Sequence, residues 1–229
     1  MKIPLSRRLL EVCRFVYPGD RVADVGCDHG YLGIYLLKNH IASQVIASDV
    51  REGPLNAAVF NSKKYGVRDK MRFFLSDGVR NIPQDFNVLV CAGMGGDTMI
   101  SILEAAPWLK EGDYRLILQC QSKRPELRRY LSDNGWLIRE EAVVRDGRFL
   151  YTVMEVVAMP GMVLTPGGCH FPPALLKNPG PELPAFYRWV VSGLRTVVDN
   201  QGEQADPFKQ EALQELTNLP EELAWLKEE

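Results

Sequence analysis

Residues 24–32, which read DVGCDHGYL, decide the fold that we predict for this 229-residue chain. An apolar run at 21–26 leads into this stretch and a helical pattern at about 31–39 follows it, so a strand is predicted to turn here into a helix. Gly26 and Gly30 free the backbone to bend sharply, and they let a ligand approach the amide groups at the start of the helix. The alternative is a tight strand-to-helix turn that binds nothing.

Outward from this turn, short apolar runs alternate with helical patterns. Strands are predicted at 21–26, 44–50, 71–76, 87–92 and 114–120, and helices at about 31–39, 53–65, 96–105 and 124–134. A further amphipathic helix is predicted at 5–16, ahead of the first strand. The alternation predicts βαβ units and therefore an α/β fold with a parallel, doubly wound sheet.

The pattern changes after residue 135. Two strand-like runs, 136–145 and 148–158, are joined only by Asp146-Gly147, a pair that is typical of a tight hairpin between antiparallel strands. A parallel sheet that ends in an antiparallel hairpin resembles the sheet of Rossmann-like class I methyltransferases. The fold class predicted for the first 158 residues is therefore that sheet.

The chain is predicted to have three parts. Residues 1–158 are predicted to form the catalytic domain, and residues 159–184 a linker. Seven of the fifteen prolines fall at 160–184, and this density argues against regular elements there. Residues 185–229 are predicted to form a helical hairpin with apolar residues on one face. Within it, Pro220 is expected to begin a new helical turn.

Composition narrows the class of protein. No apolar run approaches the roughly 20 residues needed to cross a bilayer, and the first residues lack the apolar stretch of a signal peptide, so we expect a cytoplasmic protein that contacts no membrane. The five cysteines form no C-x-x-C pair, which favours reduced thiols. Together with the spacing of the three histidines, this predicts no metal site. No obligate protein partner is evident.

Charge is unevenly distributed along the chain. Residues 201–229 carry a net charge of −6, which leaves +4 on the other 200 residues although the whole chain carries −2. The basic clusters among those 200 residues suit contacts to nucleic-acid phosphates, and solvated helix faces are the alternative interpretation. The candidate RNA-binding residues are Lys63, Lys64, Arg68, Lys70, Lys123, Arg124, Arg128 and Arg129, with Arg72 beside the first group.

Two carboxylates in the first turn indicate the charge of the ligand. Asp28 stands where a nucleotide-binding G-x-G-x-x-G motif has its middle glycine, so a pyrophosphate would meet a negative charge. The sulfonium and amino groups of S-adenosylmethionine would instead be attracted to Asp24 and Asp28. The motif therefore favours S-adenosyl-L-methionine over a nicotinamide dinucleotide as cofactor.

Two further acids follow the next strands. Asp49 ends the second strand, where a carboxylate can accept hydrogen bonds from both ribose hydroxyls of an adenosine. The third strand ends in Ser76-Asp77-Gly78, where an acid can accept a hydrogen bond from the exocyclic amine of the cofactor. Each acid alone is more often a helix cap or a solvated turn. Acids after three successive strands favour a cofactor crevice.

The fourth strand ends in a glycine-rich loop, Cys91-Ala92-Gly93-Met94-Gly95-Gly96. Its glycines let the backbone lie flat beside a bound base or the reactive methyl group, and Met94 offers an apolar contact. An ordinary glycine-rich turn is the alternative.

These motifs together resemble the bacterial tRNA (adenine(22)-N1)-methyltransferase family, known as TrmK, over residues 1 to about 158. The matching motifs are LSRRL from Leu5, DVGCDHGYL from Asp24, ASDV from Ala47, SDG from Ser76, AGMGG from Ala92 and LILQ from Leu116. The helical hairpin resembles the coiled-coil domain of that family. Cys120 departs from the family pattern, which often has proline there, and so does the proline-rich linker.

The resemblance implies transfer of the methyl group of S-adenosylmethionine to N1 of an adenine in tRNA. The residues that this resemblance predicts to bind the cofactor are Arg7, Asp24, Gly26, Asp28, Gly30, Asp49, Val50, Ser76, Asp77, Gly78, Ala92 and Gly93. His29, Tyr31 and Met94 are expected to border the base that reacts, with Tyr31 as the stacking residue. A capped helix start and core packing are the alternatives for His29 and Tyr31. No residue is assigned to proton transfer.

Three other functions stay open at this point. A methyltransferase that acts on another RNA, a protein or a small molecule would keep the same crevice. A nicotinamide oxidoreductase would share the sheet but require a glycine at position 28. A non-catalytic RNA-binding scaffold is disfavoured by the intact acids Asp24, Asp28, Asp49 and Asp77.

Overall fold

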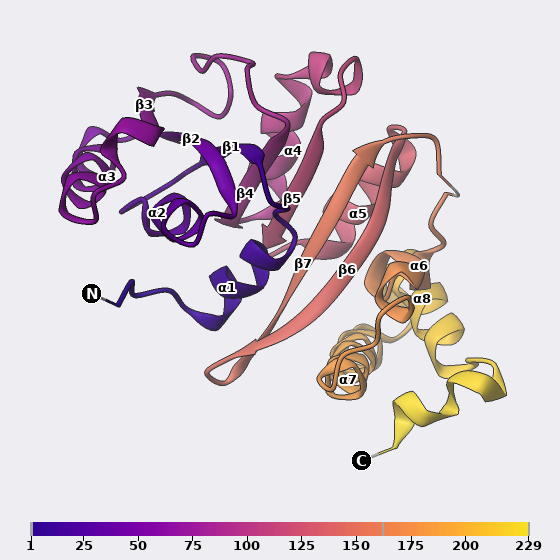
Figure 1. The fold of residues 1–229 in the computed structure, drawn as a ribbon. Coiled ribbons are helices and arrows are strands. Elements are labelled where there is room, and N and C mark those ends of the chain that lie inside the picture. The colour runs from indigo at the N-terminus through magenta and orange to yellow at the C-terminus, as the bar shows by residue number, and fades with distance from the viewer. Residues whose placement is uncertain (1, 162, 229) are drawn as a thin grey trace.

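The computed structural model describes residues 2–161 and 163–228, and Figure 1 shows a sheet with helices on both faces. The strand order is β3-β2-β1-β4-β5-β7-β6. The strands are β1 (Asp20–Val25), β2 (Ala42–Asp49), β3 (Met71–Leu75), β4 (Val88–Met94), β5 (Arg115–Cys120), β6 (Trp136–Asp146) and β7 (Phe149–Ala158). The first five strands run parallel, and β7 pairs antiparallel with both β5 and β6. The predicted fold class is confirmed.

Two layers of helices cover the sheet. The helices are α1 (Arg7–Arg14), α2 (Tyr31–Lys38), α3 (Glu52–Lys64), α4 (Gly96–Glu104), α5 (Arg124–Asp133), α6 (Pro166–His170), α7 (Leu183–Gln201) and α8 (Pro207–Thr217). In Figure 1, α1, α2 and α3 lie on one face of the sheet, and α4 and α5 lie on the other. Each face has its own apolar core because the parallel strands are buried on both sides.

The strand order places a crevice at one edge of the sheet. The chain runs outward from β1 to β2 and β3, and then returns to pair β4 with the other side of β1. The direction of the chain across the sheet thus reverses between β1 and β4. The helices that follow these two strands diverge, so a ligand fits between them at the carboxyl ends of β1 and β4. DVGCDHGYL lies at this point.

The terminal hairpin forms as predicted, but its turn is shifted by one residue. Asp146 is still paired, opposite Phe149, and the two loop residues are Gly147 and Arg148. Gly147 has φ +61°, which suits a loop whose first residue takes positive φ. Asp146 therefore belongs to the strand, and its carboxylate accepts a hydrogen bond from the backbone amide of Arg8 at 3.3 Å.

The expectation that prolines exclude regular elements from 160–184 is wrong. Helix α6 and the 3-10 helix η3 (Pro173–Leu176) lie there, each with a proline in its first turn, where the missing amide hydrogen costs nothing. Beyond them, α7 packs against α8 and against the 3-10 helix η5 (Glu221–Lys227), which Pro220 precedes, around a third apolar core. In the described ranges 2–161 and 163–228, no helix is long and apolar enough to cross a membrane.

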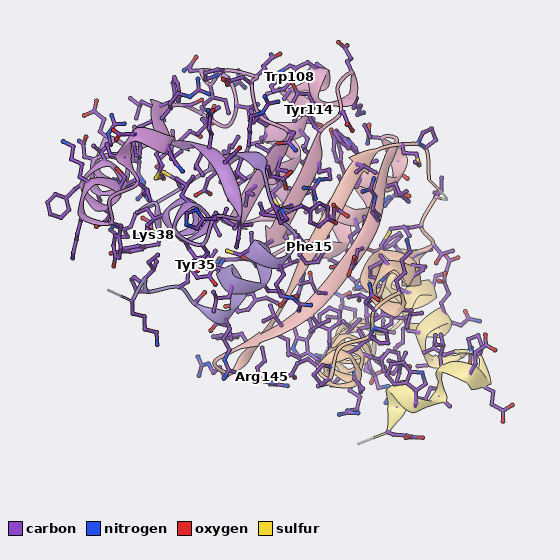
Figure 2. The ribbon with its side chains drawn as sticks, in the orientation of Figure 1. Phe15, Tyr35, Lys38, Trp108, Tyr114 and Arg145 are labelled. Atoms are coloured by element: carbon purple, nitrogen blue, oxygen red, sulfur yellow. The ribbon has the colours of Figure 1, made fainter. Side chains whose placement is uncertain are left out.

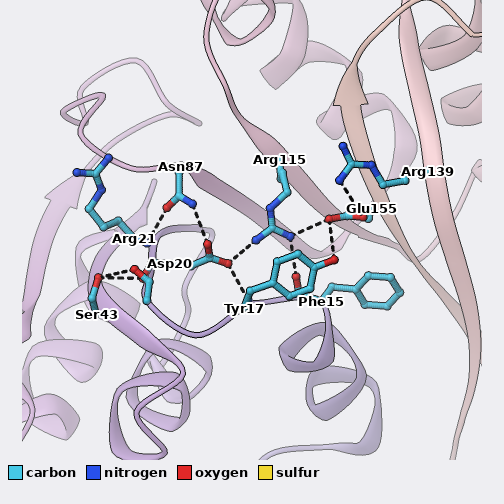
Figure 3. Close-up of polar contacts among 10 residues, drawn as sticks. Phe15, Tyr17, Asp20, Arg21, Ser43, Asn87, Arg115, Arg139 and Glu155 are labelled. Atoms are coloured by element: carbon cyan, nitrogen blue, oxygen red, sulfur yellow. Dashed lines mark hydrogen bonds and ion pairs between the residues drawn. The ribbon is translucent and has the colours of Figure 1, made fainter.

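Side chains close the amino-terminal edge of the strands, opposite the crevice. Figure 2 labels Trp108 and Tyr114, whose rings lie 5.3 Å apart at this edge, and Phe86 packs against both. Figure 3 shows Arg115 between two acids there: it pairs with Asp20, and it donates a hydrogen bond to Glu155 Oε1 at 2.7 Å. This filled edge leaves the carboxyl ends of the strands as the open side of the sheet.

The ion-pair network of Arg115 makes a testable contribution to stability. Replacing Arg115 by alanine leaves the buried carboxylates of Asp20 and Glu155 without their main partner, so we expect the free energy of unfolding in urea to fall by about 3–5 kcal/mol. Arg14→Ala is the control, because Arg14 pairs with Glu11 on the surface, and it should cost only about 0–1 kcal/mol. Equal losses in the two variants would show that the network does not stabilise the fold.

Candidate cofactor and substrate site

A cavity of about 430 Å³ opens at the carboxyl ends of β1 to β4. It brings together the four strand ends that the sequence singled out, together with residues of α1 and α4. The lining residues are Arg8, Leu9, Asp24, Val25, Gly26, Cys27, Asp28, His29, Tyr31, Leu32, Asp49, Val50, Arg51, Ser76, Asp77, Gly78, Ala92, Gly93, Met94, Thr98, Ile102 and Gln121. Four of them are aspartates and two are arginines, so the lining carries net negative charge.

The first loop depends on its glycines. Gly26 has φ +72°, and a Cβ atom there would collide with the Sδ-methyl group of Met94 across the cavity floor. Gly30 has φ +71° and begins α2, where a Cβ atom would stand 2.8 Å from the Cβ of Ala58. Backbone amides of Gly26 and Cys27 both donate to the carbonyl oxygen of Ser48, at 2.8 and 2.9 Å, which fixes the loop against β2.

The end of β2 holds the same loop through Asp49. The Oδ2 atom of Asp49 accepts a hydrogen bond from the backbone amide of Asp28 at 3.2 Å, and Oδ1 accepts one from the amide of Arg51 at 3.0 Å. Asp28 itself has φ +49°, a conformation that aspartate tolerates better than most residues. Each carboxylate oxygen of Asp49 keeps a lone pair for a ligand hydroxyl.

Asp24 is the most perturbed acid of the cavity. It is 3% exposed, and its Oδ2 atom has no hydrogen-bond partner in the described part of the chain, nor has the neighbouring hydroxyl of Ser48. Burial, together with the charges of Asp49 and Asp28, raises the pKa of Asp24 to about 7, against a weaker opposite effect of a backbone hydrogen bond from Gly33. A buried, ionised carboxylate without a partner destabilises the folded state unless a cationic ligand binds beside it.

The turn after β3 uses its side chains differently from the prediction. The hydroxyl of Ser76 donates to the carbonyl of Gly78 at 2.9 Å and accepts from the amide of Asn81 at 3.1 Å, so it shapes the turn. Asp77 is exposed, and its carboxylate lies 3.5 Å from Arg80. Among these residues, the free acceptor at the cavity wall is the carboxylate of Asp77.

The glycine-rich loop after β4 is fixed by Gln119 of β5. The Oε1 atom of this fully buried side chain accepts a hydrogen bond from the amide of Gly93 at 3.0 Å and another from the guanidinium of Arg8. The amide of Gln121 donates to the carbonyl of Met94 at 2.8 Å. The loop is therefore fixed at the cavity wall, with α1 joined to it through Arg8.

Aromatic side chains form the outer rim. The rings of His29 and Tyr31 lie 6.0 Å apart, and Tyr65 packs edge-on against Tyr31 at 6.4 Å. His29 is exposed, and its Nε2 atom lies 3.8 Å from Asp28. Within residues 2–161 and 163–228, no three His, Cys, Asp or Glu side chains gather as a metal site would require, and all five cysteines are free thiols.

Comparison with known proteins identifies the family. Residues 5–154 match the family described as a methyltransferase domain. A tRNA (adenine(22)-N1)-methyltransferase of Bacillus subtilis is 31% identical over 158 residues, which cover 69% of this chain and 66% of that protein. Matches to curated relatives span 61% to 71% of those proteins. The chain belongs to the TrmK family of methyltransferases.

Solved structures of TrmK-like proteins share nearly the whole fold. The B. subtilis tRNA methyltransferase TrmK has a TM-score of 0.76 at 27% identity, with 99% of each chain covered. The structure of Streptococcus pneumoniae Sp1610 in complex with S-adenosyl-L-methionine has a TM-score of 0.81 at 29% identity, over 93% of this chain and 98% of that one. The similarity extends through the C-terminal helices of this TrmK-family chain.

Most of the predicted site residues of the TrmK motifs meet at the cavity, including His29, Tyr31 and Met94. Gly30 lies behind the wall, at the start of α2. Arg7 is the exception, because its side chain is exposed and faces a different groove, beside Glu11 and Arg14. Its neighbour Arg8 lines the cavity instead, so the choice of Arg7 within LSRRL is corrected to Arg8.

The predicted RNA-binding residues divide into exposed and buried ones. Arg128 is 1% exposed, pairs with Glu141 at 2.6 Å, and donates to the carbonyl oxygens of Cys169 and His170 at 2.9 and 3.1 Å. Its predicted contact with RNA is therefore wrong: it joins α5 to the end of α6. The sequence pattern gave no sign of this, because a buried arginine and a surface arginine look alike beside charged neighbours.

The remaining cations of these clusters face solvent or a groove. Lys63, Lys64, Arg68 and Lys70 are exposed along α3 and the turn that follows it. On α5, Lys123 and Arg129 are exposed, and Lys123 pairs with Asp97 at 2.5 Å. Arg124 is partly buried over the rings of Phe186 and Trp189.

Several lining residues escaped the sequence analysis. Thr98 and Ile102 reach the cavity from α4, and Gln121 reaches it from the loop after β5. Gln119 lies outside the cavity but accepts hydrogen bonds from Arg8 and Gly93. Its position at the end of the LILQ motif is the feature of the sequence that could have indicated this role. A lone polar residue at the end of an apolar strand is a signal that such a side chain has a specific partner.

The glycine at the cavity floor can be tested by substitution. Gly26→Ala forces a side chain into positive φ and into the methyl group of Met94, so we expect the predicted cofactor to bind about tenfold or more weakly. Gly53→Ala is the control, since a Cβ atom at position 53 of α3 meets nothing within 4 Å. Isothermal titration calorimetry with S-adenosylhomocysteine measures both. Unchanged affinity in Gly26→Ala would remove this loop from the cofactor site.

Proposed function

We propose that the chain is an S-adenosylmethionine-dependent methyltransferase that acts on N1 of the adenine at position 22 of tRNA. One observation carries the proposal: the cavity joins four aspartates to a glycine-rich loop that a neighbouring glutamine holds in place. The membership in the TrmK family and the similarity to B. subtilis TrmK support the choice of substrate. A tRNA partner follows from the same similarity.

The cofactor is held along the strand ends. Asp49, whose two oxygens already fix the loop amides, accepts the ribose hydroxyls with its remaining lone pairs. Asp77 accepts a hydrogen bond from the exocyclic amine of the adenine ring. Asp24 and Asp28 lie where the amino group and the sulfonium need negative charge, and Asp24 gains a partner for its otherwise unpaired oxygen.

The bound cofactor supplies an electrophilic methyl group on a positively charged sulfur. The N1 atom of a neutral adenine has a free lone pair, so attack requires no prior deprotonation by the protein. The residues around the cavity orient the base: Gly93 and Met94 form the flat wall, Tyr31 stacks, and His29 closes the rim. Orientation of this kind contributes up to about 7–11 kcal/mol in well-aligned systems.

N1 lies on the Watson–Crick edge of adenine, so the base enters the cavity only when it is unpaired or turned out of its stack. The body of the tRNA then lies outside the cavity. Exposed cations on either side are suited to its phosphates: Lys63, Lys64, Arg68 and Lys70 beside α3, and Lys123 and Arg129 on α5.

Nucleoside mass spectrometry tests the proposal. The purified chain is incubated with unmodified tRNA transcript and cofactor that carries an isotope-labelled methyl group, and the RNA is then digested. We expect labelled 1-methyladenosine, mapped to position 22 by partial digestion. A transcript with guanine at position 22 is the control and should stay unlabelled. Label in another nucleoside, or in no RNA, would contradict the proposal.

A further inference from the structure

A second cavity, of about 320 Å³, lies between α5 and α7, outside the reaction cavity. We call it the α5–α7 groove; its walls include Ser122 to Arg124 on one side, and Phe186 and Trp189 on the other. Figure 1 shows α7 beside the β6–β7 hairpin, on the far side of that hairpin from α2 and α3. Its volume falls within the about 300–1,000 Å³ of typical small-ligand sites.

An exposed aromatic ring lines this groove. Trp189 is 55% exposed, although its neighbour Phe186, with which it stacks at 5.9 Å, is buried. The guanidinium of Arg124 lies 4.7 Å from the centre of the Trp189 ring and 5.4 Å from that of Phe186. These contacts hold the indole in place, so a planar ligand that stacks on it meets a preformed surface.

The groove carries positive charge. Lys123 pairs with Asp97 and Arg128 pairs with Glu141, which leaves Arg124 and Lys209 in the lining against one acid, Glu126. Burial, with Arg128 nearby, lowers the pKa of Arg124 only to about 10, so this guanidinium stays charged near neutral pH. An exposed indole among cations is the combination on which single-stranded nucleic acids bind, through base stacking and phosphate contacts.

The groove adjoins the reaction cavity along one stretch of the chain. Gln121 lines the reaction cavity, and the next two residues, Ser122 and Lys123, line the groove. The wall between them is fixed by backbone hydrogen bonds from Gln121 to Met94 at 2.8 Å and from Gly96 to Ser122 at 2.9 Å. A nucleotide near the reacting base can therefore reach the groove along the same rim.

We propose that the α5–α7 groove binds a second, unpaired nucleobase of the RNA substrate, stacked on Trp189. The inference rests on the proposed function, since it assigns a second contact to the same RNA. The second base does not react; it orients the strand that carries the reacting adenine. The positive lining favours RNA over a protein partner. A protein would have to present an apolar or acidic surface to the groove.

Substitution of the indole tests this site. Trp189→Ala removes the stacking surface, so we expect tRNA to bind about 5- to 150-fold more weakly in filter-binding titrations. Trp189→Phe keeps a ring and should retain most of the affinity. The slope of affinity against salt concentration should stay the same in both variants, because stacking releases no counterions. Affinity for S-adenosylhomocysteine should also match the wild type.

Phe149→Ala is the matched control, since it removes an exposed aromatic ring that lines neither the groove nor the reaction cavity. Its tRNA affinity should match the wild type, and thermal unfolding should show all variants folded. Unchanged tRNA affinity in Trp189→Ala, or an equal loss in Phe149→Ala, would overturn the inference and leave the groove as a surface for a protein. Methylation of tRNA by the wild type tests the proposed function independently of the groove. If the wild type methylates tRNA, the proposed function stands whatever the variants show. If it does not, the proposed function fails.

Discussion

One carboxylate oxygen of Asp24, buried at the end of β1, has no hydrogen-bond partner among the described residues, and it sets the electrostatic character of the cavity. A carboxylate in this position is stable only if it takes up a proton or if a positive ligand group stands beside it. Asp49, Asp28 and Asp77 extend the negative charge along the same edge of the sheet. The fold makes this possible because the amino-terminal edge is filled by aromatic rings and the Arg115 network, which leaves the carboxyl ends open.

Two buried polar side chains connect this site to the rest of the molecule. Gln119 joins the glycine-rich loop to Arg8 of α1, and so the first helix becomes part of the cavity. Arg128 joins α5 to Glu141 of the hairpin and to the last carbonyl groups of α6. Through Arg128 the C-terminal helices are fixed beside α5, where Trp189 of α7 meets Arg124.

The sequence predicted the sheet, the hairpin and the loops that line the cavity, because each depends on local patterns: glycines after strands, acids at strand ends, and alternation of strand and helix. It failed where side-chain direction decides. Arg7 and Arg8 are neighbours, yet only Arg8 turns into the cavity, and Arg128 turns inward while Arg129 faces solvent. The prolines of 160–184 suggested a linker because proline breaks helices, whereas Pro166 and Pro173 begin short ones. The division into domains stays a prediction.

The central claim is that the cavity is built for a cationic nucleoside. Its most direct test is calorimetric titration of the wild type with S-adenosylmethionine and with NAD, from pH about 6 to about 8. The folded-state pKa of Asp24 is raised to about 7, so the folded chain holds a proton there at low pH, and a cation must displace it. S-adenosylmethionine should therefore bind more tightly as the pH rises through about 7, with proton release on binding below it, and NAD should bind weakly throughout. Tight binding of NAD, together with no uptake of S-adenosylmethionine, would contradict the claim.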